Sequence, residues 1–500
     1  MTEKHYLLKI FGLGTAPRVI TFLFTLVSFP LLVRALGAAE YGVFVYVSSV
    51  IALFEPIIDF GVSSATGKVI AAARVQRPDS IRQELFQWIK VQAVVATVGF
   101  SVAVVAGYFY FSVAGAPVGG NLSLYALLTV TAWVAVGNAL SKATMTSLLA
   151  FKDVAVLETA ETIIRDFGWI CVALILPTAT ALAAVTLAGA VIQLFLGGVL
   201  LRGRLKEYRT PESSAAVRVP GARKEMLRET LHFLGLRFAT RAFQSFPLIL
   251  IGNIVGSQLV GLIGAYGRVT EMSSLPFSLF SRGLMVKAYE IKANGYAAIN
   301  VFWRVLVRLS VIAFVTAGGL FLASGDIARI MVPESPNARL LFAIMSVLVL
   351  AQSISNLYAP ASDYVGGLAR RVFFLGACAI VQIPLIWGLA RLWGEIGAVV
   401  GLVGCYSVMI AGYVLIAKRV FFGSQRFHPP KDVPIAVAIT TGALTASLII
   451  GAYLGMAGSG ELTRSLMALV LYAGILLISF VAVPALKPVY PTLKFLDLGQ

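Results

Sequence analysis

Long apolar runs separated by short polar segments dominate the chain from Phe11 to the C-terminus. Runs of about 18 or more residues can cross a hydrocarbon core of roughly 30 Å, because a helix rises about 1.5 Å per residue. The strands of a transmembrane barrel would instead alternate polar and apolar residues over short segments. The pattern predicts an all-α membrane protein with about fourteen spans. The predicted spans are residues 11–36, 41–70, 85–112, 122–150, 156–177, 179–201, 233–256, 259–288, 300–324, 338–366, 372–392, 396–417, 433–456 and 464–486.

Composition supports the same class of protein. Hydrophobic residues make up 59% of the chain and charged residues only 13%, about half the charged fraction of a soluble domain. The first apolar run follows Lys4 and Lys9 but is too long for a secretory signal and contains no small-residue cleavage site, so we expect it to be retained.

Basic residues divide unevenly between the two sets of connecting segments and so predict the orientation. One set holds most of the Lys and Arg residues, including a dense stretch at 202–228 and a second at 418–431. The positive-inside rule places this set in the cytoplasm, together with both termini. The net charge of +17 then reflects contact with anionic lipid headgroups, and nucleic acid is not expected as a partner.

A polar stretch after the sixth span, with Pro211, Pro220 and Gly221, has the composition of a linker. Residues 11–18 (FGLGTAPR) before it resemble residues 234–241 (LGLRFATR) after it, and Gly37 and Gly42 match Gly256 and Gly261. Parallel repeats of six spans commonly hold a substrate path at their interface. We therefore predict six-helix lobes at 1–202 and 231–422, a cytoplasmic linker at 203–230, and two additional helices with a cytoplasmic tail at 423–500.

Charged side chains within the predicted spans are the candidate functional residues. A charge at the bilayer centre costs at least ~2.5 to 3.5 kcal/mol on insertion scales, so such residues usually face a bundle interior or a watery cavity. Because a planar guanidinium donates paired hydrogen bonds to phosphate, the arginines predict a cationic cavity that binds an anionic ligand. The predicted substrate-binding residues are Arg18, Arg165, Arg237, Arg241 and Arg268.

Simpler roles compete with this interpretation for three of these residues. Arg18 and Arg241 lie about two turns from the cytoplasmic side and could extend to headgroups. Arg268 could pair with Glu271 three residues later. Arg165 is instead expected to be a lone cation that faces the cavity, because the adjacent Asp166 should point elsewhere on the helix.

Acidic residues in the same spans are candidates for ion coupling. Glu55 and Asp59 share a helix face, and Glu271 lies near Arg268. Burial disfavours a charged carboxylate and so favours proton uptake, although pairing with arginine would oppose it.

Motifs of soluble enzymes are absent from the sequence, including Walker A, HExxH and GxSxG. Cys171, Cys378 and Cys405 have no metal-ligand spacing, so neither a cofactor nor a metal is predicted.

The chain resembles the O-antigen-type flippases, the polysaccharide-transport branch of the multidrug/oligosaccharidyl-lipid/polysaccharide exporter superfamily. The resemblance rests on short motifs spread over the chain: Leu36-Gly37, Tyr41-Gly42, Asp59-Phe60-Gly61, Leu275-Pro276, and Gly394 with Gly397-Ala398.

The resemblance implies two lobes around a central cavity, alternating access, and a bacterial inner-membrane location. The implied substrate is an undecaprenyl-diphosphate-linked oligosaccharide, with Arg18, Arg241 and Arg268 near its diphosphate or acidic sugars. Membrane lipids, a polysaccharide polymerase and chain-length machinery are the further partners that it suggests.

Three other functions compete with the flippase. A cation-coupled multidrug exporter would need a net acidic cavity, whereas the cavity predicted here is rich in arginine. A lipid II flippase is closer in chemistry to the oligosaccharide flippase. A membrane-embedded glycosyltransferase or ligase would need a larger outward loop with catalytic groups. Tyr266, Phe277 and Phe280 could stack on sugar rings, although packing against lipid is the commoner reason for aromatic residues.

Overall fold

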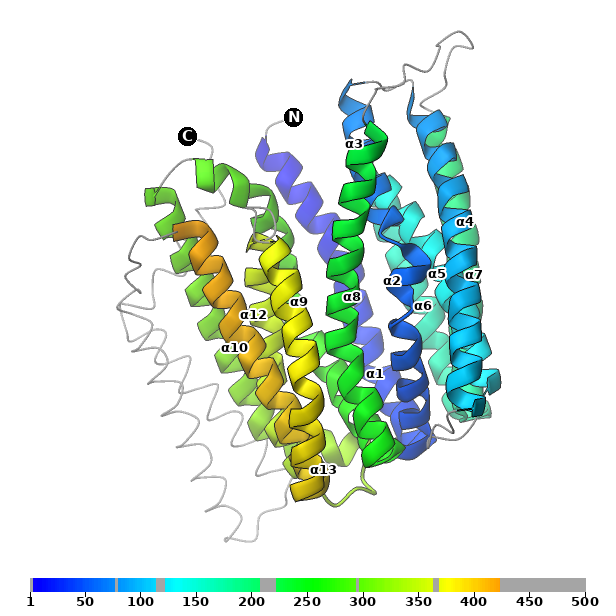
Figure 1. Ribbon diagram of the computed structural model, residues 1–500, viewed down its shortest axis with the longest axis vertical. Coiled ribbons are helices and arrows are strands. Elements are labelled where there is room, and N and C mark those ends of the chain that lie inside the picture. Colours follow the sequence, from blue (N-terminus) through cyan, green and yellow to red (C-terminus); the bar gives the residue numbers. More distant parts are fainter. Residues whose placement is uncertain are drawn as a thin grey trace. The chain divides into compact units, whose positions relative to one another are not determined.

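The computed structural model describes residues 3–76, 80–113, 122–206, 222–293, 296–362 and 368–422, and within these ranges it is helical without strands (Figure 1). The chain divides into two compact units, Met1–Gly261 and Leu262–Gln500. The prediction of an all-α fold is confirmed. The predicted spans at 433–456 and 464–486 lie outside the described residues, so the number of fourteen stays a prediction.

The first unit contains eight α-helices and a short π-helical turn among its described residues, plus the beginning of a ninth helix. Its long helix α1 packs mainly against α6, α5 packs against α7, and α8 contacts α1, α2 and α3. The elements are α1 (Glu3–Ala52), α2 (Glu55–Asp59), α3 (Val62–Gln76), α4 (Ile81–Tyr108), η2 (Phe109–Val113), α5 (Leu122–Ser147), α6 (Phe151–Ile175), α7 (Ala179–Leu205), α8 (Ala222–Ile254) and the start of α9 (Ser257–Ala293).

The second predicted span, 41–70, is not continuous. It is divided among the end of α1, the five-residue helix α2 and α3. Pro56 has no N–H to donate to the Ala52 carbonyl, which is where α1 ends. Phe60 and Gly61 then take φ values of 49° and 75°, which stop α2 before α3 begins.

Two matched glycines adopt left-handed backbone conformations. Gly37 interrupts α1 with a φ of 75°, and Gly256 separates α8 from α9 with a φ of 119°. These are the positions at which the sequence comparison of the two halves placed a turn. The boundaries of the two six-helix lobes themselves stay a prediction.

The second matched pair brings two backbones into contact. A Cβ atom on Gly42 would collide with the Ser257 carbonyl oxygen, and one on Gly261 would collide with the Ala38 carbonyl oxygen. The contact is reciprocal, since each glycine meets the helix that carries the other. The second half of α1 and the first turn of α9 therefore pack without intervening side chains.

Apolar side chains cover the outer faces of several helices, as expected of a protein in lipid. Val94 on α4 and Phe195 on α7 are 65% and 74% exposed. Among the described residues, seven helical segments are long and apolar enough to cross a membrane. Helices α6, α8 and α9 are not among these segments, and they are also the helices on which the candidate arginines 165, 237, 241 and 268 lie.

The second unit contains the rest of α9, together with α10 (Tyr296–Met331), α11 (Ala338–Met345), α12 (Val347–Ser362) and α13 (Leu368–Phe422). Helix α10 packs against α11 and α12, and both of these contact α13. Trp393 and Gly394 leave helical geometry inside α13, Gly394 with a φ of 58°. This break separates the predicted spans at 372–392 and 396–417 and confirms the turn between them.

Candidate functional site

Four of the five predicted arginines have described side chains, and each of these four forms an ion pair with a carboxylate of its own unit. Arg18 belongs to α1, but its side chain lies outside the described part of the chain. The candidate site is therefore a set of arginine–carboxylate pairs.

The first pair joins the broken second span to α8. Arg237 on α8 pairs with the Asp59 carboxylate, and its Nη2 donates a second hydrogen bond of 2.9 Å to the Ser64 hydroxyl. The Ser63 hydroxyl also donates to Asp59, and the Gln92 amide reaches the Asp59 backbone carbonyl at 3.5 Å. The Asp59 side chain is 6% exposed and Arg237 is 38% exposed. This pair thus ties α2, α3 and α8 together through a nearly buried carboxylate.

The second pair lies one turn away on the same two helices. Arg241 Nη2 is 2.6 Å from Glu55 Oε2, and the two side chains are 45% and 41% exposed. Residues four apart lie on one face of a helix. The order is reversed between the helices, since the earlier residue of α2 meets the later residue of α8, which requires α2 and α8 to run in opposite directions (Figure 1).

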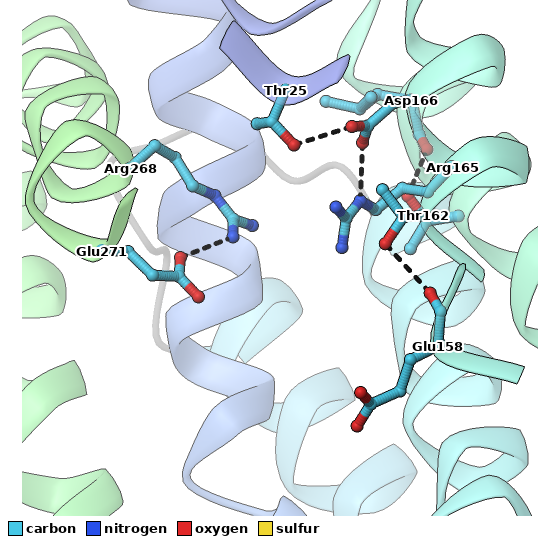
Figure 2. Close-up of polar contacts among 9 residues, drawn as sticks. Thr25, Glu158, Thr162, Arg165, Asp166, Arg268 and Glu271 are labelled. Atoms are coloured by element: carbon cyan, nitrogen blue, oxygen red, sulfur yellow. Dashed lines mark hydrogen bonds and ion pairs between the residues drawn. The ribbon is translucent and has the colours of Figure 1, made fainter. Parts of the chain in front are cut away.

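The third pair corrects an expectation. Arg165 was expected to be a lone cation with Asp166 pointing away, but its Nε lies 3.0 Å from Asp166 Oδ1 (Figure 2). Asp166 is fully buried and also accepts a 2.7 Å hydrogen bond from the Thr25 hydroxyl of α1. Arg165 reaches its neighbour because its long side chain extends along α6, with the guanidinium 5.0 Å from the Trp169 ring. A buried carboxylate in an apolar helix needs this cation to offset lost hydration.

The fourth pair lies in the second unit, within α9. Arg268 Nη1 is 2.9 Å from Glu271 Oε2, in the i, i+3 arrangement considered from the sequence (Figure 2). Their side chains are 37% and 63% exposed, so the pair is accessible. The local ion pair is therefore present, and the proposed role of Arg268 in substrate binding stays a prediction.

Sequence reasoning missed a polar cluster inside the first unit. Lys142 Nζ on α5 lies 2.6 Å from Glu161 Oε2 on α6, and the buried Gln193 amide of α7 donates to the same oxygen at 2.5 Å. Lys142 and Glu161 both fall inside predicted spans, so the cost of intramembrane charge could have identified them. They join three helices of one unit, as a structural cluster does.

A second missed cluster consists of uncharged groups. The Tyr46 hydroxyl on α1 donates to Asn253 Oδ1 on α8 at 2.5 Å and lies 2.6 Å from the Tyr110 hydroxyl of η2. The Asn253 amide donates in turn to Tyr110 at 3.2 Å. Tyrosine and asparagine are ordinary in membrane helices, so no sequence signal marked them.

Two of the aromatic residues considered for sugar stacking are core residues. Tyr266 is fully buried, with its ring centroid 4.9 Å from that of Phe342, and Phe277 is 3% exposed. Neither ring offers a free face. The side chain of Phe280 lies outside the described residues.

The described residues hold no group of three or more His, Cys, Asp or Glu side chains that could bind a metal ion. The chemistry available at the arginine pairs is the exchange of ionic partners. A guanidinium can release a carboxylate and bind a phosphate or another carboxylate with similar geometry.

Solved structures of similar fold are membrane transporters. An inward-facing multidrug resistance MATE family transporter of the MOP superfamily has a TM-score of 0.62 at 11% identity, covering 80% of this chain and 94% of its own. The lipid II flippase MurJ, in an inward closed conformation, has a TM-score of 0.61 at 14% identity over 93% of this chain and 99% of its own. A MOP superfamily transporter from Pyrococcus furiosus, described as having reverse polarity of its binding pocket, has a TM-score of 0.57 at 13% identity over 83% and 94%.

The fold is thus that of the MOP superfamily transporters. A family model described as "Polysaccharide biosynthesis protein" matches residues 11–285. The chain belongs to this polysaccharide biosynthesis family, and the matched region includes all four described arginine pairs. No curated protein sequence matches the chain.

Proposed function

We propose that the protein is a flippase that moves an undecaprenyl-diphosphate-linked oligosaccharide from the cytoplasmic to the outer leaflet by alternating access, for surface or exported polysaccharide synthesis. The family match supports a role in polysaccharide biosynthesis, and the fold supports transport. The observation that carries the proposal is the pair of α8 arginines held by carboxylates of the broken second span.

The physical argument concerns hydration of the substrate headgroup. A diphosphate loses most of its hydration when it enters a low-dielectric region, at a cost that only paired charges and hydrogen bonds can offset. Fixed guanidinium groups supply both, because each donates hydrogen bonds in a planar fork. The lipid tail would remain in the bilayer while the arginines receive the headgroup.

The setting proposed for this activity is the bacterial inner membrane, with both termini in the cytoplasm and the two six-helix lobes at 1–202 and 231–422 alternating between leaflets. A polysaccharide polymerase and its chain-length machinery would then consume the product on the outer side. Arg18, Arg165, Arg237, Arg241 and Arg268 are proposed as substrate-binding residues.

Complementation tests this function directly. In a strain that lacks its native oligosaccharide flippase, the wild-type chain should restore surface glycan, and Arg241→Ala or Arg268→Ala should abolish the restoration at normal protein levels. Arg329→Ala removes an exposed arginine at the end of α10 and should restore glycan fully. Full restoration by both test variants would refute the role of these arginines.

A lipid II flippase is the second candidate, because the match to MurJ extends over 93% of the chain. Rescue of a strain depleted of its lipid II flippase, without restoration of surface glycan, would favour it. Drug resistance without glycan restoration would instead favour a multidrug exporter.

A further inference from the structure

The two ion pairs between α2 and α8 are held with different strength. Asp59 is 6% exposed and interacts with Arg237 and the Ser63 hydroxyl, while Arg237 also donates to Ser64. Glu55 is 41% exposed and Arg241 is 45% exposed, joined by the 2.6 Å contact of Nη2 and Oε2. The first pair is enclosed by other polar groups, whereas solvent or a ligand can reach the second.

Exposure determines how easily an ion pair can exchange its partner. A buried carboxylate that loses its cation is left uncompensated, which strongly opposes separation. An exposed pair gains little from its association, since water screens the attraction and can solvate both groups after separation. The pair between Glu55 and Arg241 is therefore the exchangeable one, and the pair between Asp59 and Arg237 holds the helices in register.

We propose that Glu55 is a built-in competitor for the anionic ligand: it occupies the Arg241 guanidinium in the empty transporter and yields this position to the diphosphate of the substrate. The inference rests on the proposed function and names the regulation of the same site. It gives the two carboxylates different tasks: Asp59 keeps Arg237 throughout, and Arg237, which is 38% exposed, meets the substrate without leaving Asp59.

The exchange of partners at Arg241 changes the charges around Glu55. Glu55 is paired with Arg241, and the Arg237–Asp59 pair lies one turn away on the same two helices. When a diphosphate binds Arg241, Glu55 no longer has this guanidinium as its partner, and an anion lies beside it. The Glu55 carboxylate therefore tends to take up one proton from the cytoplasm. Anion binding should then be favoured by acidic pH, and removal of the carboxylate should weaken this dependence.

Binding to the purified full-length chain tests the competition. The probe is a short-chain prenyl diphosphate, which carries the anionic group without the sugar, measured by calorimetry between pH 6 and 8. Glu55→Gln should bind roughly two- to fivefold more tightly than the wild type, the range that the strength of an exposed ion pair predicts. The affinity of this variant should also change less with pH than that of the wild type.

Glu161→Gln is the matched control, because it makes the same substitution in another ion-paired glutamate, whose Oε2 lies 2.6 Å from Lys142. It should leave both the affinity and its pH dependence unchanged. Glu55→Asp keeps the carboxylate and should keep the pH dependence of the wild type, so the proposal remains testable even where Glu55→Gln folds poorly.

Unchanged or weaker binding by folded Glu55→Gln would overturn the inference, and so would equal tightening by Glu161→Gln. Loss of the pH dependence in Glu55→Asp would also overturn it. The proposed function is judged separately by the glycan assay. Glycan restoration by the wild type without tightening in Glu55→Gln rejects the competition alone, whereas failure of the wild type to restore glycan rejects the function.

Discussion

Asp59 contacts more groups of the site than Glu55, the other acidic residue of α2. It is nearly buried, and Arg237, Ser63 and Gln92 all contact it. Removing one partner of such a pair leaves a charge without compensation, which costs more than the pair contributes when intact.

We predict that Asp59→Asn destabilises the protein by about 2 kcal/mol. This is less than the ~3–5 kcal/mol of a fully buried pair, because Arg237 is 38% exposed and can be partly solvated. Thermal melting of the purified protein should show the loss. The double variant Asp59→Asn/Arg237→Gln should recover part of it, since no unpaired charge remains. Additive losses in the double variant would contradict the interpretation.

The sequence identified the candidate arginines but not all of their partners. The cost of charge in lipid identified Arg165, Arg237, Arg241 and Arg268 without any structural information, because that cost depends only on the residue type and the span. Their partners could not be predicted in the same way. Arg165 pairs with its direct neighbour Asp166, and the side-chain conformation that allows this contact does not follow from helical spacing.

At the scale of helices, the contact between α1 and α9 is a backbone contact. Gly42 and Gly261 each lie against a carbonyl oxygen of the other helix, so neither position has room for a methyl group. Close approach of this kind depends on glycine and is common in membrane helix packing.

Gly42→Ala and Gly261→Ala are therefore expected to destabilise the protein by about 1–3 kcal/mol each, the usual cost of overpacking. The intrinsic preference of helices for alanine offsets only about 1 kcal/mol of this. Gly198→Ala on α7 is the matched control, because a Cβ there meets nothing within 4 Å. Melting temperatures should fall for the two contact variants and should stay unchanged or rise for the control.

The sequence predicted some helix boundaries well and others poorly. The turn at Gly394 and the one near Gly256 were found because glycine interrupts two apolar runs at these points. The second break within 41–70, at Phe60, was missed, since hydrophobicity continues through this residue although its backbone takes a φ of 49°. A local backbone conformation that leaves the hydrophobic pattern unchanged cannot be seen in that pattern.

At the scale of the whole molecule, the distribution of Lys and Arg predicts which loops face the cytoplasm. The segment that follows α7 is rich in basic residues, whereas the short connection between α10 and α11 is poor in them. The positive-inside rule assigns the two segments to opposite sides of the membrane.

Cysteine labelling measures this assignment. After alanine replaces the native Cys171, Cys378 and Cys405, a cysteine introduced at Glu334 should react with an impermeant maleimide in intact cells. A cysteine introduced at Lys206 should react only after the membrane is opened. Labelling of both positions in intact cells would refute the predicted orientation.

Helix α2 has a consequence for how movement could spread through the protein. It is five residues long, with a break on each side, so its hydrogen-bond ladder is separate from those of α1 and α3. A short helix with a break in backbone hydrogen bonding at each end can change its orientation through changes in a few backbone dihedrals. Asp59 fixes the C-terminal end of α2 to Arg237, whereas Glu55 at the N-terminal end is 41% exposed. The ionic contact of Glu55 can therefore be remade while Asp59 keeps Arg237 and the helices on either side stay folded.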